Sequence, residues 1–478
     1  MADPRPLPTE IFLNVASQLA DSESIDTATL HHLCLTSRFL RDVAQPVLFT
    51  YVYLPITFRH TLRQLYLFIR TLIDRPTLGK HVKQLNLLTD VRFKGTREDI
   101  GNKYWREAGI LPQRLFNSLE PSNESDYPVL VDAILTKVPN LESLALRTWW
   151  GQPVKILDQI AERRVTDDFL PKLKTFHVQR GHETGPVSLD VYIHLLEHPA
   201  LEQICTQGSV LTRLGQTATV NRLSRSNIEM YCCFMDLPPL MRLLEICTTL
   251  IQFSFVVPRV NAYNNRANSM FLRPQFAPRS CTQALLATHS STLERLYVDF
   301  HWHYNLDATE DEPELEEDGL ENSCWVYPSF RGFERLTYMT IEFGRLMSVN
   351  DLPASLVGIN LTRCKFSAMS QETLQDWLRL KETCCPAIRD VVIAGEEGLD
   401  DGIRMVRKHA GQLEQEVQAS ADGRILTFPL RSQGVSYVLQ LQSRIPLYDA
   451  NVTSEHDYDE TSEEDSVRGG AAQGTPEH

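Results

Sequence analysis

Two short histidine patterns are, by residue type and spacing, the parts of this chain most suited to metal chemistry. His194 and His198 stand four positions apart in the segment HLLEH, which matches the H-x-x-E-H pattern of one class of zinc proteases. On a helix, two histidines at this spacing share one face, which is the geometry that a zinc ion needs. Pro199 follows at once, however, and the segment HPALEQI repeats the pattern of VPNLESL and LPKLKTF elsewhere in the chain. We therefore interpret His198 as part of a repeated junction and keep a zinc hydrolase as a remote alternative.

The second pattern, HWH, places His301 and His303 on the same side of a strand. A metal site is conceivable there, but the sequence offers no third ligand close by. The chain also contains no glycine-rich phosphate loop, no G-x-S-x-G segment and no C-x-x-C pair. The adjacent cysteines 232–233 and 384–385 would point to opposite faces of a strand, which argues against shared metal ligation. We expect neither catalysis by this chain nor a cofactor.

The acidity of the chain is concentrated in two segments. The 478 residues are 42% hydrophobic and 23% charged, which is typical of globular proteins, and the net charge is −14. Residues 305–324 carry nine acids and no base, residues 445–478 carry nine acids and one base, and the rest of the chain has a net charge of +3. We expect an acidic loop insertion at 305–324 and a disordered acidic tail at 446–478. Since no long basic stripe is present, binding to nucleic acid is not expected.

The sequence predicts a protein of the cytoplasm, the nucleus or both. No run approaches the roughly 18 apolar residues that a membrane span needs, so no membrane contact is expected. The start, MADPRPLPTE, has no apolar region of the kind that a signal peptide contains. Ten cysteines in a chain of this length fit a reducing compartment better than a disulfide framework.

The first fifty residues predict three short amphipathic helices. In the first, Ile11, Val15 and Leu19 recur every four positions and share one face, and Pro8 suits the start of a helix. The second and third follow around Leu33 and after the N-cap types Thr36 and Ser37. Three helices of about ten residues bury little surface, so we expect part of the apolar face to remain open for a partner.

This region resembles an F-box. The resemblance rests on Leu7-Pro8-x-x-Ile11-x-x-x-Val15-x-x-x-Leu19 and on LTSRFLRDVAQPVLF at 35–49, and it covers about 45 of the 478 residues. The link from Asp21 to Thr27 is slightly longer than the family pattern. The resemblance implies a module that docks on the Skp adaptor and, through it, on the cullin and RING subunits of ubiquitin ligases. It implies that the adaptor contact and its supporting core consist of Leu7, Pro8, Ile11, Val15, Leu19, Leu33, Leu35, Phe39 and Val43. The alternative is a helical cap on a larger fold.

The rest of the chain repeats one short apolar phrase. Its best copy, Leu356-x-x-Ile359-x-Leu361-x-x-Cys364, completes the strand phrase of leucine-rich repeats. Helical stretches lie between several copies, which predicts stacked units with parallel strands lining one face and helices on the other. Several unrelated α/β domains are the alternative. Copies begin at Val82, Leu141, Leu173, Leu201, Ile228, Leu250, Leu293, Leu336, Leu356 and Ile388.

Residues 68–88 are similar to the link between F-box and first repeat in fungal F-box proteins with degenerate leucine-rich repeats. The expected fold is therefore α/β. It comprises a three-helix F-box at 1–54, a helical linker at 55–80, an irregular leucine-rich-repeat-like solenoid at 81–445 and the acidic tail at 446–478. The resemblance implies the substrate-recognition subunit of an SCF-type E3 ubiquitin ligase, a non-catalytic subunit that holds an unknown protein substrate. A scaffold that binds the adaptor without delivering a substrate for ubiquitination is the alternative.

Strand alternation predicts where such a substrate would bind. If Leu144 and Leu146 point to the core, the residues between them point outward, and the same parity applies to the other copies. Outward aromatic and charged side chains are those that a protein ligand uses, although a plain solvated face is the alternative for any one of them. The candidates are Arg147, Trp149, His177, Gln179, Tyr297, Asp299, His301, Tyr338, Glu342 and Asn360.

Overall fold

A computed structural model of the chain shows a mixed α/β protein, as the sequence predicts. It describes residues 8–21, 27–54, 58–87, 126–148, 170–180, 187–192, 200–211, 226–257, 276–301, 325–364, 379–395, 418–419, 425–432 and 435–442, with a few single positions between them. Within these residues there are nine α-helices and two sheets, of fourteen and three strands. None of the described helices is both long and apolar enough to cross a membrane.

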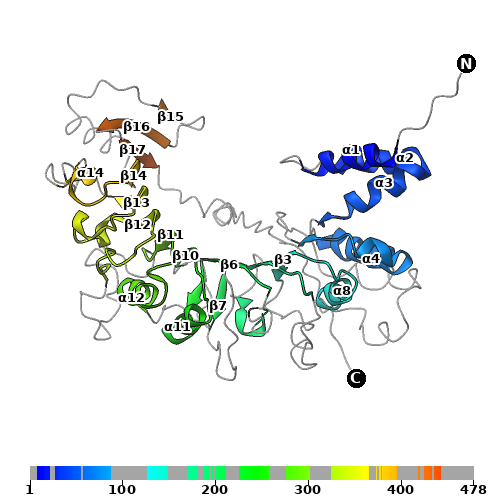
Figure 1. Ribbon diagram of the computed structural model, residues 1–478. Helices are drawn as coiled ribbons and strands as arrows, with labels where there is room; N and C mark the ends of the chain where they lie inside the picture. The colour runs from blue at the N-terminus through cyan, green and yellow to red at the C-terminus, as the bar shows by residue number, and fades with distance from the viewer. Residues whose placement is uncertain are drawn as a thin grey trace, which may run out of the picture. The chain divides into compact units, whose positions relative to one another are not determined.

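From its first strand to β14 (Asp390–Gly395) the large sheet is built in chain order, each strand pairing with the preceding strand of the sheet (Figure 1). Its eleven leading strands run parallel, as expected when a helix or loop returns the chain to the same edge after each strand. These strands are β1 (Tyr51–Tyr53), β2 (Gln84–Leu87), β3 (Ser143–Thr148), β4 (Thr175–Arg180), β6 (Gln203–Gln207), β8 (Asn227–Tyr231), β10 (Gln252–Val256), β11 (Arg295–Asp299), β12 (Tyr338–Glu342), β13 (Gly358–Cys364) and β14 (Asp390–Gly395). The sheet ends with β17 (Val435–Gln442) beside β14, followed by the antiparallel strands β16 (Ile425–Ser432) and β15 (Gln418–Ala419).

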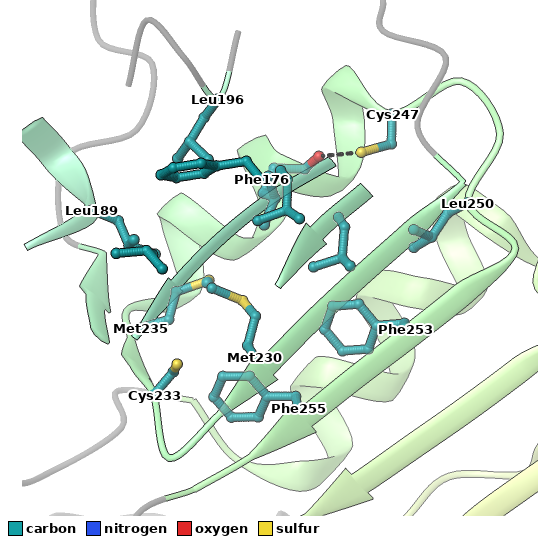
Figure 2. Close-up of a cluster of buried hydrophobic side chains, with 14 of the residues drawn as sticks. Phe176, Leu189, Leu196, Met230, Cys233, Met235, Cys247, Leu250, Phe253 and Phe255 are labelled. Atoms are coloured by element: carbon teal, nitrogen blue, oxygen red, sulfur yellow. Dashed lines mark hydrogen bonds between the residues drawn. The ribbon is translucent and has the colours of Figure 1, made fainter. Parts of the chain in front are cut away.

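The recurring apolar phrase forms rows of buried side chains across this sheet. One row consists of Leu85, Leu144, Phe176, Ile204, Ile228, Phe253, Leu296, Met339, Ile359 and Val391, all almost fully buried. Figure 2 shows part of the resulting core, where Phe253 and Phe255 of β10 project to the same side as Phe176 and Met230. Ile228 pairs with Ile204, the second apolar position of its phrase. The copy expected to begin at Ile228 therefore begins three positions earlier.

Helices cover one face of the sheet and bury the rows. Figure 1 shows α8 (Asp126–Leu135), α11 (Leu237–Ile246) and α12 (Pro278–His289) on the same side of the strands. Both α11 and α12 have a proline at the first or second helical position, where a missing N–H costs nothing. The short helices α5 (Pro76–Gly79) and α14 (Leu380–Thr383) lie between strands in the chain order.

The segment expected as a linker contributes to this same core. Helix α4 (Phe58–Asp74) buries Leu65, Ile69 and Leu72 completely or almost so, and it contacts α8. The sheet also begins earlier than expected, since β1 pairs with β2. The sequence pattern missed this because β1 is only three residues long.

A second sheet, which the sequence did not predict, stands beside the first. Strands β5 (Val187–Ser188), β7 (Ser209–Leu211) and β9 (Phe234–Met235) run parallel, and β7 and β9 directly follow β6 and β8. The chain turns between the two sheets at Gly208 (φ +69) and Cys232 (φ +52). A side chain at Gly208 would lie 2.7 Å from Cβ of Arg180, so glycine is required there for both backbone angle and space.

The three N-terminal helices form where expected and have a small core of their own. They are α1 (Thr9–Asp21), α2 (Thr27–Thr36) and α3 (Arg38–Leu48). Ser37 caps α3 by accepting a hydrogen bond from the backbone N–H of Leu40 at 3.1 Å. The fully buried residues of the bundle are Ala16, Leu30 and Ala44.

Candidate protein-binding surfaces

Helix α1 exposes apolar side chains that the sequence placed on one face. Ile11 is 44% exposed and Val15 is 48% exposed, whereas Leu19 packs against the bundle core. The core contact is made instead by Ala16 and by Phe12. Ile11 and Val15 are therefore left without cover among the described residues, as a partner contact requires and as a helical cap does not.

The junction of α2 and α3 exposes two further large side chains. Leu35 is 69% exposed and Phe39 is 46% exposed. The Phe39 ring meets the Phe12 ring of α1 edge to face, with centroids 5.3 Å apart, so this junction is packed against α1. We call Ile11, Val15, Leu35 and Phe39 the N-terminal apolar surface.

The remaining residues expected at the adaptor contact support this surface or lie beside it. Val43 is buried and Leu33 is half-buried in the bundle core. Pro8 is exposed at the start of α1, and Leu7 lies outside the described residues. Large apolar side chains exposed together on a small bundle are typical of protein-binding surfaces.

The bundle is joined to the sheet by directional contacts. The backbone carbonyl of Thr50 accepts hydrogen bonds from the N–H groups of Lys83 and Gln84, both at 3.0 Å. The rings of Phe49 and Phe68 stack with centroids 5.9 Å apart. None of the residues of the N-terminal apolar surface takes part in these contacts, and all four stay 44–69% exposed among the described residues.

The sheet face opposite the buried rows, which we call the open face, carries polar and aromatic side chains. The strand register places one row of it side by side from β4 to β14: His177, Cys205, Glu229, Ser254, Tyr297, Thr340, Asn360 and Val392. Five of the expected substrate-binding residues lie on this face, namely His177, Gln179, Tyr297, Tyr338 and Asn360. Only the backbone of Arg147 is described, and Trp149 lies outside the described residues.

Side chains of the open face are connected to one another. Gln252 Nε2 donates to Glu229 Oε1 at 2.9 Å, and the Tyr231 hydroxyl donates to Glu229 Oε2 at 3.3 Å. Burial lowers the pKa of His177, and burial together with Glu229 raises the pKa of Cys205 to about 12. Both groups are therefore neutral at pH 7, which suits a binding surface better than a nucleophile.

A hollow of about 320 Å³ opens on this face across β10 to β14. Gly358, which lines the hollow, makes room for the Tyr338 ring, because a Cβ there would lie 2.8 Å from that ring. Tyr338 is 46% exposed, and the guanidinium carbon of Arg295 lies 5.8 Å from its ring centroid. The side-chain oxygen Oδ1 of Asn360, which also lines the hollow, is buried without a hydrogen-bond partner among the described residues.

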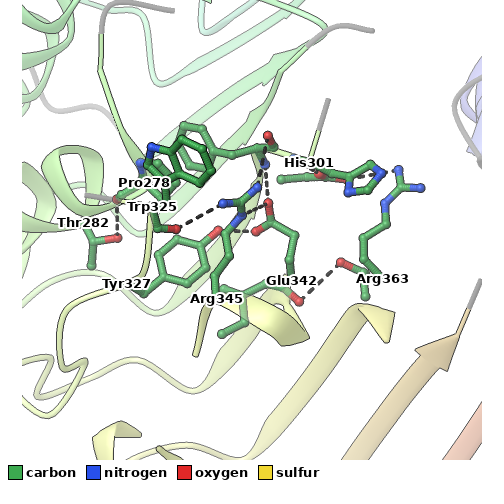
Figure 3. Close-up of polar contacts among 12 residues, drawn as sticks. Pro278, Thr282, His301, Trp325, Tyr327, Glu342, Arg345 and Arg363 are labelled. Atoms are coloured by element: carbon green, nitrogen blue, oxygen red, sulfur yellow. Dashed lines mark hydrogen bonds and ion pairs between the residues drawn. The ribbon is translucent and has the colours of Figure 1, made fainter. Parts of the chain in front are cut away.

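Two of the expected substrate-binding residues are not exposed. Asp299 is 5% exposed and Glu342 is 2% exposed, so the expectation that strand parity brings them to the surface is wrong. Both lie at the carboxyl ends of their strands, where the chain covers them. Figure 3 shows Glu342 bonded to Arg345, which is itself 1% exposed.

Glu342 and Arg345 hold the two ends of the segment 302–324 together. Glu342 Oε1 accepts from Arg345 Nε at 2.9 Å and from the Phe300 N–H at 2.5 Å, and Oε2 accepts from the Tyr327 hydroxyl. Arg345 Nη1 donates to the Trp325 carbonyl at 3.1 Å, and its own carbonyl accepts from the Tyr327 N–H at 3.0 Å. The expected acidic insertion lies outside the described residues. Phe300 and Trp325, which precede and follow it in the chain, both form hydrogen bonds with this ion pair.

Charge around this pair is only partly balanced. The pKa of Glu342 is raised by burial and by nearby Asp299, while Arg345 opposes the shift. Asp299 accepts from the His301 N–H at 3.0 Å and forms an ion pair with Arg363 at 3.5 Å. His301 is half-buried and remains a candidate for binding, whereas His303 lies outside the described residues.

The described residues do not bring together a metal site. His198 is 8% exposed, and its Nδ1 accepts a hydrogen bond from the Ala200 N–H at 3.3 Å. His194 lies outside the described part of the chain, within which no group of three or more metal-binding side chains occurs.

Adjacent cysteines were expected to point apart only if they lie on a strand, and Cys384 and Cys385 do not meet that condition. Their Sγ atoms are 3.5 Å apart, because the two residues lie in the turn after α14 and not on a strand. The Cys385 hydrogen bond, together with the cation of Arg331, lowers the pKa of Cys384 to about 7 despite partial burial.

The sequence of the chain was compared with protein-family models and with curated proteins. No protein-family model matches the chain, and no curated protein is significantly similar to it in sequence. The functional interpretation therefore depends on the N-terminal apolar surface and the open face themselves.

Proposed function

We propose that this protein is the substrate-recognition subunit of an SCF-type E3 ubiquitin ligase. In this proposal α1 to α3 form an F-box that docks on the Skp adaptor, and the chain-ordered sheet is a leucine-rich-repeat-like solenoid that holds a substrate protein. The observation that carries the proposal is the N-terminal apolar surface, where Ile11, Val15, Leu35 and Phe39 are 44–69% exposed at positions of the F-box motif.

The exposed area is large enough to matter for binding. Fully burying one large apolar side chain contributes about 1.5–3 kcal/mol, so covering a half-exposed one contributes about 1 kcal/mol. Four such side chains contribute about 4 kcal/mol before the cost of association. A helical cap on the sheet, the alternative, has no need to expose them.

The second half of the proposal is supported by the repeated order of the sheet and by the polar, aromatic open face. Eleven parallel strands in chain order, each with apolar side chains on one face, are the arrangement expected of stacked repeats. A ligase subunit of this kind needs no catalytic residues, because it raises the effective concentration of substrate lysines near the ubiquitin carrier.

A pull-down from cell extract tests the adaptor contact. Wild-type protein should recover the adaptor and cullin, and a Leu35→Ala, Phe39→Ala variant should lose about 2 kcal/mol, or about thirtyfold in affinity. Leu67→Ala is the matched control, since Leu67 is a 44% exposed residue of α4 outside the motif. Failure of folded wild-type protein to recover the adaptor, or equal recovery by the double variant, would contradict the proposal.

Ubiquitin transfer separates a substrate receptor from a scaffold. Proteins retained by both the wild type and the double variant are candidates for the open face. In a reconstituted ligase a receptor should direct ubiquitin onto them only when the N-terminal apolar surface is intact. Binding of the adaptor without any such transfer would favour the scaffold.

A further inference from the structure

The hollow on the open face has one charged side chain at each end. Arg295 of β11 and Asp390 of β14 lie in the same row of the sheet, with Tyr338 and Gly358 between them. Because neighbouring strands are about 4.8 Å apart, three strand spacings separate the Cα atoms of the two residues by about 14 Å. Neither side chain forms an ion pair with another residue of the described parts.

The floor between the charges is shaped to receive a side chain. The Tyr338 ring occupies the space that a side chain at Gly358 would take, and the Arg295 guanidinium carbon lies 5.8 Å from the centroid of that ring. Asn360 adds an amide oxygen that is buried and lacks a donor among the described residues. An unmet acceptor at the bottom of a hollow is satisfied by an O–H or N–H group that enters it.

We propose that the hollow binds an extended peptide segment that crosses the strands, with an acidic side chain on Arg295 and a basic side chain on Asp390, four residues apart. An extended chain rises about 3.3 Å per residue, so four residues span about 13 Å, close to the separation of the Cα atoms of Arg295 and Asp390. Residues i, i+2 and i+4 of such a segment point to the same side. The residue at i+2 then lies midway along the row, beside the Tyr338 ring, and presents a hydroxyl or amide to Asn360.

The proposal takes the open face as the substrate-binding surface, and so it rests on the proposed function while naming the class of segment recognised. Arg295 suits the acidic position, because its planar guanidinium is held by the Tyr338 ring and presents paired donors to a carboxylate. Because the two ends of the hollow carry opposite charges, they favour ligands whose charges are spaced to match. They disfavour segments whose charges all have the same sign.

Selection from a phage-displayed library of short random peptides on the full-length chain tests the proposal. Wild-type protein should enrich peptides with an acid and a base four residues apart, and Arg295→Gln or Asp390→Asn should weaken them by about tenfold. Arg295→Glu should instead enrich peptides with two bases at that spacing, and Asp390→Lys should enrich peptides with two acids. Arg389→Glu is the matched control, since this exposed arginine adjoins Asp390 but does not line the hollow.

Three outcomes would overturn the inference: no enrichment on wild-type protein, enriched peptides without the charge pattern, or peptides that bind Arg295→Glu as well as wild type. Adaptor recovery by the same variants separates this inference from the proposed function. If the variants still recover the adaptor but the selected peptides show no charge pattern, only the proposed peptide site is contradicted. If the selected peptides show the expected charge pattern but the protein does not recover the adaptor, only the proposed ligase function is contradicted.

Discussion

Replacing Arg345 by methionine should destabilise the region around β12 by about 3–5 kcal/mol, because it leaves Glu342 buried without its countercharge. Both side chains are almost fully buried, at 1% and 2% exposure, so solvent cannot replace the lost partner. Methionine keeps much of the packing volume, and the loss therefore reports the charge and its hydrogen bonds. The Trp325 carbonyl also loses its bond from Nη1.

A double-mutant cycle isolates the pair from other effects of the substitution. Glu342→Gln keeps an acceptor for the Phe300 N–H while removing the charge, so Glu342→Gln together with Arg345→Met should cost less than the sum of the single changes by about 2–3 kcal/mol. Lys83→Met at the exposed Lys83–Glu142 pair, where the side chains are 53% and 39% exposed, is the control and should cost less than about 1 kcal/mol.

The effect should also depend on pH. Burial and Asp299 already raise the pKa of Glu342, and removing Arg345 removes an influence that lowers it. The folded variant therefore binds a proton more readily than the unfolded chain, and a neutral Glu342 needs no countercharge. The destabilisation should accordingly be smaller at pH 5 than at pH 8.

Urea unfolding followed by tryptophan fluorescence gives the size of these effects, and hydrogen exchange of peptides from β11 and β12 shows whether the loss is local. Additive single changes, a loss below about 1 kcal/mol, or a larger loss at pH 5 would refute the reasoning.

Three further changes have outcomes that the structure predicts. Gly79→Ala lies in a helix, where alanine normally stabilises by about 0.5–1 kcal/mol, but its Cβ would lie 2.0 Å from the backbone oxygen of Lys137, so chemical denaturation should show a clear loss of stability. Iodoacetamide should modify Cys384 first, with a rate that rises through about pH 7, and Cys281 only on unfolding, since burial raises its pKa; protection of native Cys384 at pH 8 would contradict this. His289 has a pKa lowered by burial, so the unfolded chain takes up its proton first and stability is lost as pH falls below about 6.5. Part of that loss should be absent in His289→Gln, and an unchanged pH profile would argue against it.

The buried rows of the sheet were predictable because they depend on a local pattern. Leu141, Leu144 and Leu146 each need only a strand with alternating faces to be buried, and the structure buries all three. The same holds for most copies of the phrase. The pattern placed Ile228 at the start of its copy, whereas the copy starts three positions earlier. The position was missed because the residue there is not aliphatic.

What the sequence could not show depends on contacts between distant residues. Parity correctly places Asp299 and Glu342 on the side away from the core, but strand alternation cannot show the contacts that accompany their burial, which are Tyr327 and Arg345 at Glu342 and Arg363 at Asp299. The inward face of α1 is a similar case, since Phe12 and Ala16 pack inward only because α2 and α3 lie where they do. The contact between the Sγ atoms of Cys384 and Cys385 was missed because the two residues were considered only as part of a strand, where adjacent side chains point to opposite faces.

The order of the sheet has a consequence for how the two binding surfaces behave. Each strand touches only the strands beside it, so energy is shared between nearest neighbours and a change decays along the chain. The N-terminal apolar surface precedes β1, while the hollow spans β10 to β14, with several strands in the intervening chain order. Mutations that change one surface should therefore leave the affinity of the other unchanged, so the proposed adaptor contact and the proposed substrate preference could evolve separately.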